Sequence, residues 1–223
     1  MKRAILTIAA LAAITAAWSV ELKSAGRDAD YVQSIVGRAQ KIVDKLELAD
    51  NAAATDVRNI IANRYFELND IYAEYDAAVA AVKNGSLDSE LKNRIVEGAQ
   101  AVADSKLYRS HFAFPAALSI YLTDEQVEAV KDGMTYGVVG VTYTAYCDMI
   151  PRLTDEEKAQ IMAWLKEARE LAMDASNSDN KHKVFGKYKG RINNYLVARG
   201  YDISAERAEW QKRIDERGKK EKK

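Results

Sequence analysis

The chain has 223 residues, 48% of them hydrophobic and 30% charged, and its 33 basic residues balance its 33 acidic residues. This balance argues against a general nucleic-acid binder, which usually carries a basic excess, so we expect no nucleic-acid partner. The length fits one core and one domain. Two prolines leave room for long helices, and the single cysteine, Cys147, allows no internal disulfide.

Residues 1–19 have the layout of a secretory signal peptide. Two basic residues precede an apolar run, Ala4–Ala17, and the small residues Ala17 and Ser19 suit a cleavage site. The run is shorter than the roughly 20 apolar residues of a transmembrane anchor. We therefore expect a periplasmic or secreted protein without a membrane span after cleavage. An uncleaved anchor and a cytoplasmic protein are the alternatives.

Helical periodicity continues along residues 28–217, which we interpret as one all-α domain of six to eight helices followed by a charged tail at 218–223. Residues 108–121 are aromatic, contain Pro115 and are hard to assign. In chain order, the predicted helices are Tyr31–Leu48, Thr55–Val82, 88–104, one starting at Thr123, Val141–Ile150, Thr154–Asp174, 181–199 and a last one capped by Ser204.

Two helix starts are specified by capping boxes, Thr123 with Gln126 and Thr154 with Glu157. Between these helices, three glycines and two valines in residues 133–140 make a poor helix. This segment predicts a helix break or a short extended piece.

The most distinctive feature is a basic row on one face of the helix at 181–199. It consists of Lys183, Lys187 and Arg191 at intervals of four residues, joined by Asn194. Like charges at this spacing repel, so an anion beside them is favourable. The row can bind a carboxylate, sulfate or phosphate. Alternatively it pairs with the Thr154–Asp174 helix or with acids of the Thr55–Val82 helix, namely Glu67, Asp70, Glu74 and Asp76.

Aromatic residues suggest where a sugar would lie. Tyr188 and Tyr195 flank the basic row, and Tyr136 and Tyr143 can line a groove because aromatic faces suit sugar C–H surfaces. At helical spacing the same residues also suit a core.

The catalytic candidates are Tyr188, His182 and Asp132. A Tyr or His base beside a cation suits β-elimination on a uronic acid, whereas glycoside hydrolysis needs two carboxylates. However, His182 lies on the far side of its helix from Lys187. The sequence leaves open whether the protein is an enzyme; if it is, we expect a lyase or hydrolase acting on acidic oligosaccharides. Two distant histidines and the absence of a phosphate loop predict no metal and no cofactor.

Many residues together carry a resemblance to a known family. They include the runs Lys131–Val139, Val141–Tyr143, Glu167–Glu170, Ala172–Asp174 and Phe185–Leu196. They resemble a secreted bacterial family catalogued as domain of unknown function three-eight-two-six. The resemblance implies a single secreted helical domain, often encoded near polysaccharide-utilisation genes, and supplies no catalytic residues.

A looser likeness joins Leu122–Gln126 to the LTxxQ motif of Spy/CpxP-type helical chaperones. Our leading hypothesis is a carbohydrate-associated protein that binds or processes an anionic glycan fragment. The alternative is a periplasmic chaperone-like or scaffold protein without catalysis. The oligomeric state stays open.

Overall fold

The computed structural model describes residues 19–83 and 87–220, where eight α-helices of eleven residues or more accompany the short α4 and one 3-10 helix. The all-α prediction is confirmed. Apart from Ser19, the predicted signal peptide lies outside the described residues. The elements are α1 (Ala29–Val43), η1 (Asp44–Leu46), α2 (Asn51–Lys83), α3 (Ser89–His111), α4 (Ala113–Leu118), α5 (Asp124–Met134), α6 (Val138–Met149), α7 (Asp155–Met173), α8 (Ser178–Ala198) and α9 (Ile203–Lys220).

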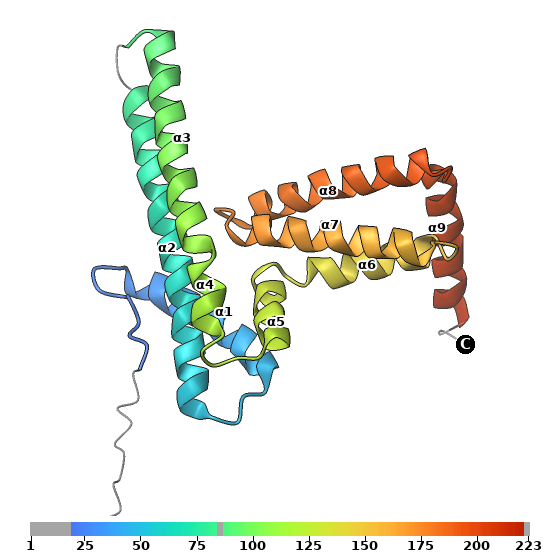
Figure 1. The fold of residues 1–223 in the computed structure, drawn as a ribbon, viewed down its shortest axis with the longest axis horizontal. Helices are drawn as coiled ribbons and strands as arrows, with labels where there is room; N and C mark the ends of the chain where they lie inside the picture. Colours follow the sequence, from blue (N-terminus) through green and yellow to red (C-terminus); the bar gives the residue numbers. More distant parts are fainter. Residues whose placement is uncertain (1–18, 84–86, 221–223) are drawn as a thin grey trace, which may run out of the picture.

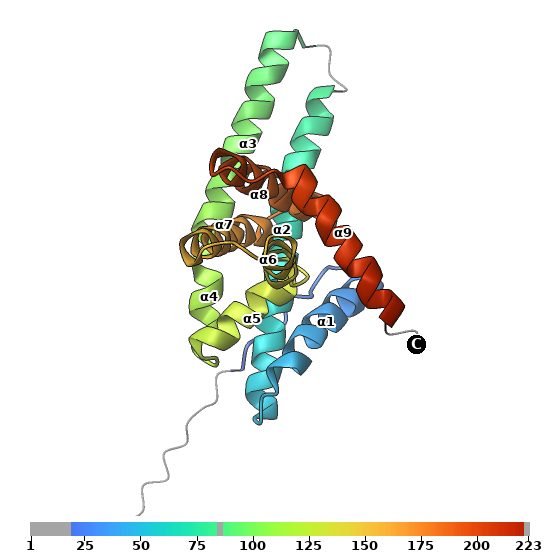
Figure 2. The ribbon, with the colours of Figure 1, turned by 90° about the vertical axis from the view of Figure 1, so that its right-hand side faces the viewer.

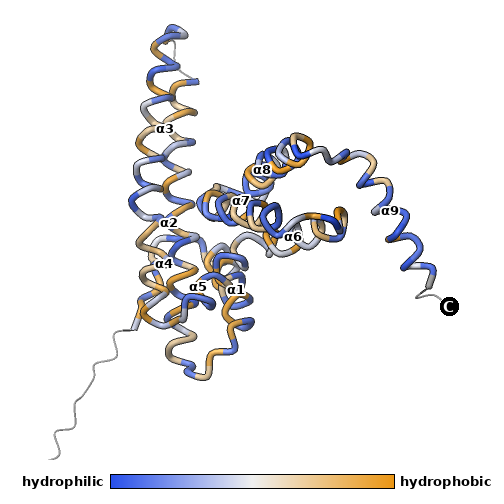
Figure 3. The backbone as a smooth tube through the Cα atoms, turned by 45° about the vertical axis from the view of Figure 1, so that its right-hand side comes forward, coloured by the Kyte–Doolittle hydropathy of each residue, from blue (hydrophilic) through white to orange (hydrophobic). Residues whose placement is uncertain are grey.

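The helices form two arms that meet at a steep angle (Figure 1). In the first arm, α2 and α3 make a long hairpin, and α1, α4 and α5 pack on its lower half. In the second arm, α6, α7 and α8 lie side by side and α9 crosses their far end (Figure 2). Most of α9 is hydrophilic (Figure 3).

Each arm has its own hydrophobic core because the apolar stripes of its helices face inward. The N-terminal core joins α1, α2, α4 and α5 around Ile61, Phe66 and Leu118. The C-terminal core joins α6, α7 and α8 around Leu165 and Phe185. Met173, at the end of α7, belongs to the N-terminal core and therefore connects the two arms.

The helix starts follow local rules. Thr123 and Thr154 both form the predicted capping boxes; for example, the Thr154 hydroxyl accepts from the Glu157 amide at 3.2 Å and the Thr154 amide donates to Glu157 at 2.9 Å. The predicted cap of the last helix is wrong. The Asp202 carboxylate, rather than Ser204, accepts from the amides of Ser204 and Ala205.

The predicted break in the glycine-rich segment is confirmed but is short. α5 continues to Met134 and α6 begins at Val138, with no extended piece between them. Tyr136 and Gly137 both adopt left-handed backbone conformations, with φ of 61° and 66°. A Cβ at Gly133 would lie 3.0 Å from the Ile42 side chain, so this glycine allows α5 to approach α1 closely.

Residues 108–121, which the sequence leaves unassigned, are mainly helical. α3 extends to His111, and α4 carries Phe114 and Leu118 into the N-terminal core. Within the described ranges, no helix has both the length and the apolarity to cross a bilayer.

Candidate functional site

A cleft lies where the two arms meet, between α1, α2, the turn from α5 to α6 and the start of α8. It consists of two adjoining hollows of about 540 and 240 Å³ that share Arg38, Tyr65 and Tyr136. Its walls come from residues as distant in sequence as Tyr31 and Lys181. The cleft therefore exists only in the folded chain.

Four cations face this cleft. Arg38, Lys41 and Lys45 lie at intervals of three and four residues, so α1 and η1 present them on one side. All three are exposed, and none forms an ion pair with another residue that the structure describes. Lys181 approaches from α8. The one carboxylate among the lining residues, Asp132, is paired with Arg169. Because the unpaired charges of the lining are positive, this arrangement attracts anions.

Lys181 is the most unusual of the four. Its side chain is buried, with 5% of the residue exposed, yet among the described residues its Nζ donates to a single acceptor, the Met134 carbonyl oxygen at 3.0 Å. An ammonium group has three donors. Burial, followed by repulsion from Arg38, lowers the pKa of Lys181 to about 8. A buried cation without a carboxylate partner is costly, and a bound anion would compensate that cost.

Tyr65 forms the aromatic floor of the cleft. The Arg38 guanidinium lies 5.5 Å from its ring centroid and the Lys181 Nζ lies 5.8 Å from it. Burial raises the pKa of Tyr65 to about 12, so its phenol stays protonated at neutral pH. Within the described residues the hydroxyl makes no hydrogen bond, which leaves it free to donate to a ligand.

Tyr136 forms the rim. It is 50% exposed, and its ring stacks on His182 with centroids 5.9 Å apart and planes inclined by 21°. A left-handed conformation is uncommon for a residue with a large side chain and tends to occur at functional sites. The turn of residues 135–137 therefore holds an aromatic ring over the cleft at some cost in backbone strain.

The start of α8 adds polar groups. Ser176, Asn177 and Ser178 line the smaller hollow, and Asn177 caps α8 by accepting from the Asn180 amide at 2.9 Å. The N-terminal end of a helix carries a partial positive charge and free amides, both of which favour an anion. The partial charge at this end of α8 is therefore positive, like the charges of the four cations.

Of the three predicted catalytic candidates, one lines the cleft, one contacts a residue of its rim and one lies elsewhere. Asp132 lines the larger hollow, where its carboxylate accepts from Arg169 at 2.9 Å, and His182 stacks on Tyr136. Tyr188 packs against the C-terminal core instead. Its pKa is raised to about 12 by burial first and then by Glu167, so Tyr188 is a poor base. The structure does not bring Tyr188 and His182 together.

The basic row of α8 faces away from the cleft. Arg191 pairs with Glu167 of α7 at 3.3 Å, and its guanidinium lies 4.5 Å from the Trp164 ring centroid. Pairing with α7 is therefore confirmed for Arg191. Lys183 donates to Asn180 at 3.2 Å, whereas Lys187 and Asn194 are exposed.

The alternative pairing of this row with α2 is not formed among the described residues, and three of the four α2 acids considered for it have other partners. Asp70 pairs with Arg27 at 2.6 Å, Glu67 pairs with Arg64 at 2.6 Å, and Glu74 pairs with Lys106. The two arms diverge, so α8 does not run along α2 (Figure 1).

The other predicted aromatic residues are divided between core and site. Tyr143 and Tyr195 pack against the C-terminal core, where Tyr195 meets Trp164 edge-on at 5.1 Å. Only Tyr136 of the predicted ligand-binding residues lines the cleft. The sequence analysis missed Arg38, Lys41, Lys45, Tyr65 and Lys181. The spacing of Arg38, Lys41 and Lys45 on one predicted helix could have indicated a second basic face. The burial of Lys181 depends on tertiary packing, which the sequence does not show.

A comparison with family models shows which family the chain belongs to. The model described as "Protein of unknown function (DUF3826)" matches residues 32–215. The chain belongs to the DUF3826 family. The matched range includes all four cleft cations and the turn that carries Tyr136, so every lining residue of the cleft except Tyr31 lies within it. No curated protein matches the sequence.

Proposed function

We propose that this DUF3826 protein binds an acidic carbohydrate fragment, carboxylated or sulfated, in the cleft between its two arms. The observation that carries the proposal is Lys181, a buried cation with one carbonyl acceptor, beside three exposed cations without ion-pair partners among the described residues. Natural cores pair such charges. A cleft that leaves them unpaired is suited to a ligand that supplies the negative charge.

The rest of the cleft supports a sugar as the carrier of that charge. Tyr65 and Tyr136 offer ring surfaces for the apolar face of a sugar. Ser176, Asn177 and Ser178 offer hydrogen-bonding groups for its hydroxyls. A guanidinium and three ammonium groups can engage a carboxylate or sulfate, Arg38 through two parallel hydrogen bonds and each lysine as a point charge.

Thermal shifts against neutral, uronic, sulfated and phosphorylated oligosaccharides test the proposal. A ligand that binds only the folded state raises the melting temperature by mass action. We expect shifts with acidic sugars in the wild type and in Lys187→Ala, an exposed lysine of α8 that faces away from the cleft. Arg38→Ala should lose most of the shift. Equal shifts in Arg38→Ala and wild type, or shifts with neutral sugars alone, would contradict the proposal.

A second candidate function has one observation in its favour. Leu91, Ile95, Val102, Tyr108 and Phe112 are exposed apolar or aromatic side chains on or next to α3. Exposed apolar surface of this kind can hold unfolded clients, as the chaperone-like alternative requires. Val102→Glu should then reduce the suppression of client aggregation while Arg38→Ala leaves it unchanged. No suppression by the wild type would remove this candidate.

A further inference from the structure

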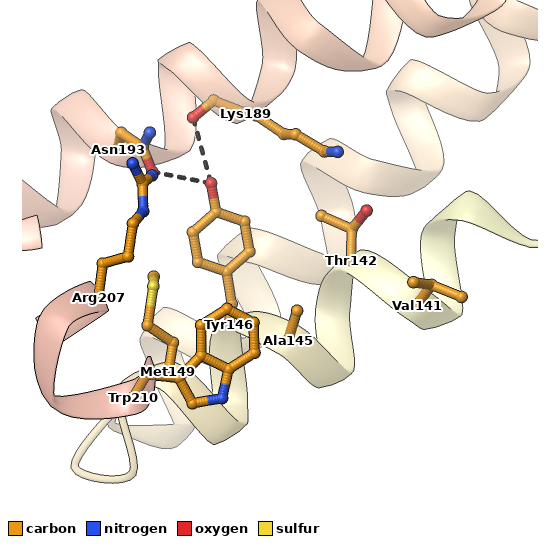
Figure 4. Close-up of a pocket in the computed structure, with 9 residues that line it drawn as sticks. All are labelled: Val141, Thr142, Ala145, Tyr146, Met149, Lys189, Asn193, Arg207 and Trp210. Atoms are coloured by element: carbon orange, nitrogen blue, oxygen red, sulfur yellow. Dashed lines mark hydrogen bonds between the residues drawn. The ribbon is translucent and has the colours of Figure 1, made fainter. Parts of the chain in front are cut away.

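A second pocket lies further along α8, between α6, α8 and α9. It has a volume of about 260 Å³ and combines an aromatic wall, made by Tyr146 and Trp210, with Lys189, Asn193 and Arg207 (Figure 4). Met149 and Ala145 complete its apolar lining. Aromatic faces with a few polar groups are typical of small-molecule sites.

The aromatic residues of this pocket are held in place by hydrogen bonds. The Tyr146 hydroxyl donates to Asn193 Oδ1 at 2.8 Å and lies 3.3 Å from the Lys189 carbonyl oxygen (Figure 4). The Trp210 indole donates to Asp148 at 2.7 Å. Because their polar atoms already have partners, the two rings offer mainly flat apolar surface to a ligand.

The polar rim of the pocket is cationic. Lys189 and Arg207 are exposed and, like the cations of the cleft, form no ion pair within the described part of the chain. The carboxylate beside the pocket, Asp148, already accepts from Trp210 and from Arg217 at 2.7 Å. In Figure 4 the Lys189 side chain extends from α8 toward the side of the pocket on which Thr142 of α6 lies.

One face of α8 connects the pocket to the cleft. His182, Lys189 and Asn193 share this face, and Gly186, an exposed residue with no atom within 4 Å of its virtual Cβ, lies between them. Lys189 and Asn193 follow Lys181 by eight and twelve residues, which is about 12 to 18 Å along a helix. The path between the two sites is thus not blocked by a side chain at Gly186.

We propose that this pocket is a second subsite for the same ligand, so that the protein binds a linear acidic oligosaccharide rather than a monosaccharide. The inference rests on the proposed function of the cleft. One acidic group of the bound oligosaccharide lies against Lys181 and Arg38 in the cleft. A second sugar ring of the same oligosaccharide lies against Trp210, and the acidic group of this second ring lies against Lys189 and Arg207.

The test is isothermal titration with two size series, galacturonate from monomer to hexamer and heparin-derived fragments from disaccharide to octasaccharide. We expect affinity to rise at least tenfold from the shortest to the longest member of the series that binds. The double variant Lys189→Ala/Arg207→Ala should lose this gain and keep wild-type affinity for the shortest fragment. Lys187→Ala is the matched control. In a Trp18→Phe/Trp164→Phe background, where Trp210 is the one tryptophan left, only the longer fragments should change the fluorescence.

The outcomes separate the two proposals. Affinity that does not depend on length, or a double variant that binds long fragments as the wild type does, overturns the second subsite and leaves the cleft proposal standing. Binding of long fragments that survives Arg38→Ala but not the double variant overturns the cleft proposal. Absence of binding by both series overturns both.

Discussion

The two arms meet at two charged regions that are built in opposite ways. In the first, which we call the paired cluster, Arg64 is 3% exposed and donates to Glu67 and Asp174 at 2.6 Å, and Arg169 is 2% exposed and donates to Glu128, Asp132 and Glu170. In the second, the cleft, Lys181 is equally buried and donates to one backbone carbonyl.

The comparison shows that a buried cation can have either a structural role or a ligand-binding role, depending on whether carboxylates of the protein contact it. Arg64 and Asp174 join α2 to the end of α7, and Arg169 joins α7 to α5, so the paired cluster holds the arms together. Each cation there has carboxylates in contact, so its charge is compensated within the protein, although Arg169 Nε has no hydrogen-bond partner within the described ranges. The cations of the cleft have no carboxylate partners among the described residues. Their arrangement therefore does not stabilise the fold, and it favours the binding of an anionic ligand.

Removing Arg169 should have the largest effect. Arg169→Ala removes a buried guanidinium from three carboxylates that are 38%, 40% and 31% exposed, those of Glu128, Asp132 and Glu170. A hydrogen bond to a charged group contributes about 1.5–3 kcal/mol, so we expect a loss at the upper end of that range. The free energy of unfolding from urea denaturation measures this loss. Arg191→Ala is the control, because its pair with Glu167 is half exposed and exposed pairs contribute about 0–1 kcal/mol. If both variants lose a similar amount of unfolding free energy, the ion pairs of the paired cluster contribute no more to stability than an exposed ion pair does.

Replacing Lys181 should have the opposite sign. Lys181→Met keeps the apolar stem and removes a desolvated charge, so we expect the free energy of unfolding at pH 7 to rise by about 1–2 kcal/mol. The same variant should lose binding of acidic fragments. Lys187→Met, at an exposed position, should change stability by about 0.5 kcal/mol or less. Destabilisation by Lys181→Met on the scale of Arg169→Ala would make Lys181 a structural residue.

The pH dependence of binding follows from the same lysine. The pKa of Lys181 in the free protein is about 8, below its ordinary 10.5, and an acidic ligand favours the protonated form. Affinity should therefore be constant below that pKa and fall by up to about tenfold per pH unit as pH rises through it. Calorimetry across this range measures the fall. If the affinity that remains in Lys181→Met falls with pH in the same way, the pH dependence belongs to another titratable group.

The stability of the ligand-free protein should change with pH in the reverse direction. Between pH 8 and 10.5 the unfolded chain binds the Lys181 proton and the folded chain does not, so the free energy of unfolding gains a contribution from this group as pH rises. Subtracting the profile of Lys181→Met isolates that contribution. A difference profile that is flat, or that falls, would contradict the lowered pKa.

The smallest effect is expected at Tyr136. Tyr136→Asn keeps a residue that tolerates the left-handed conformation and removes the ring, so stability should change little while affinity for acidic fragments falls about two- to tenfold. Tyr136→Phe keeps the ring and should bind as the wild type does. If Tyr136→Asn also binds normally, the turn serves the connection between the arms rather than the ligand.

The sequence predicts what is local and fails where the arms meet. The capping boxes of Thr123 and Thr154 are contained within four residues, so their prediction needs no tertiary information. The partner of Arg191 depends on the direction in which α8 leaves the junction, so the sequence left its pairing open between α2 and α7, and the structure shows the pair with Glu167 of α7. The burial of Lys181, in preference to Lys183 two residues later, is decided by how the start of α8 packs near Tyr65.

The central claim is that Lys181 is a cation held for an anionic ligand. NMR titration of its Nζ, with and without a saturating acidic fragment from the size series, tests this most directly. We predict a pKa near 8 in the free protein that rises toward 10.5 when the fragment is bound, because an adjacent negative charge favours the ammonium form. A pKa that does not change in the presence of the bound fragment would contradict the claim.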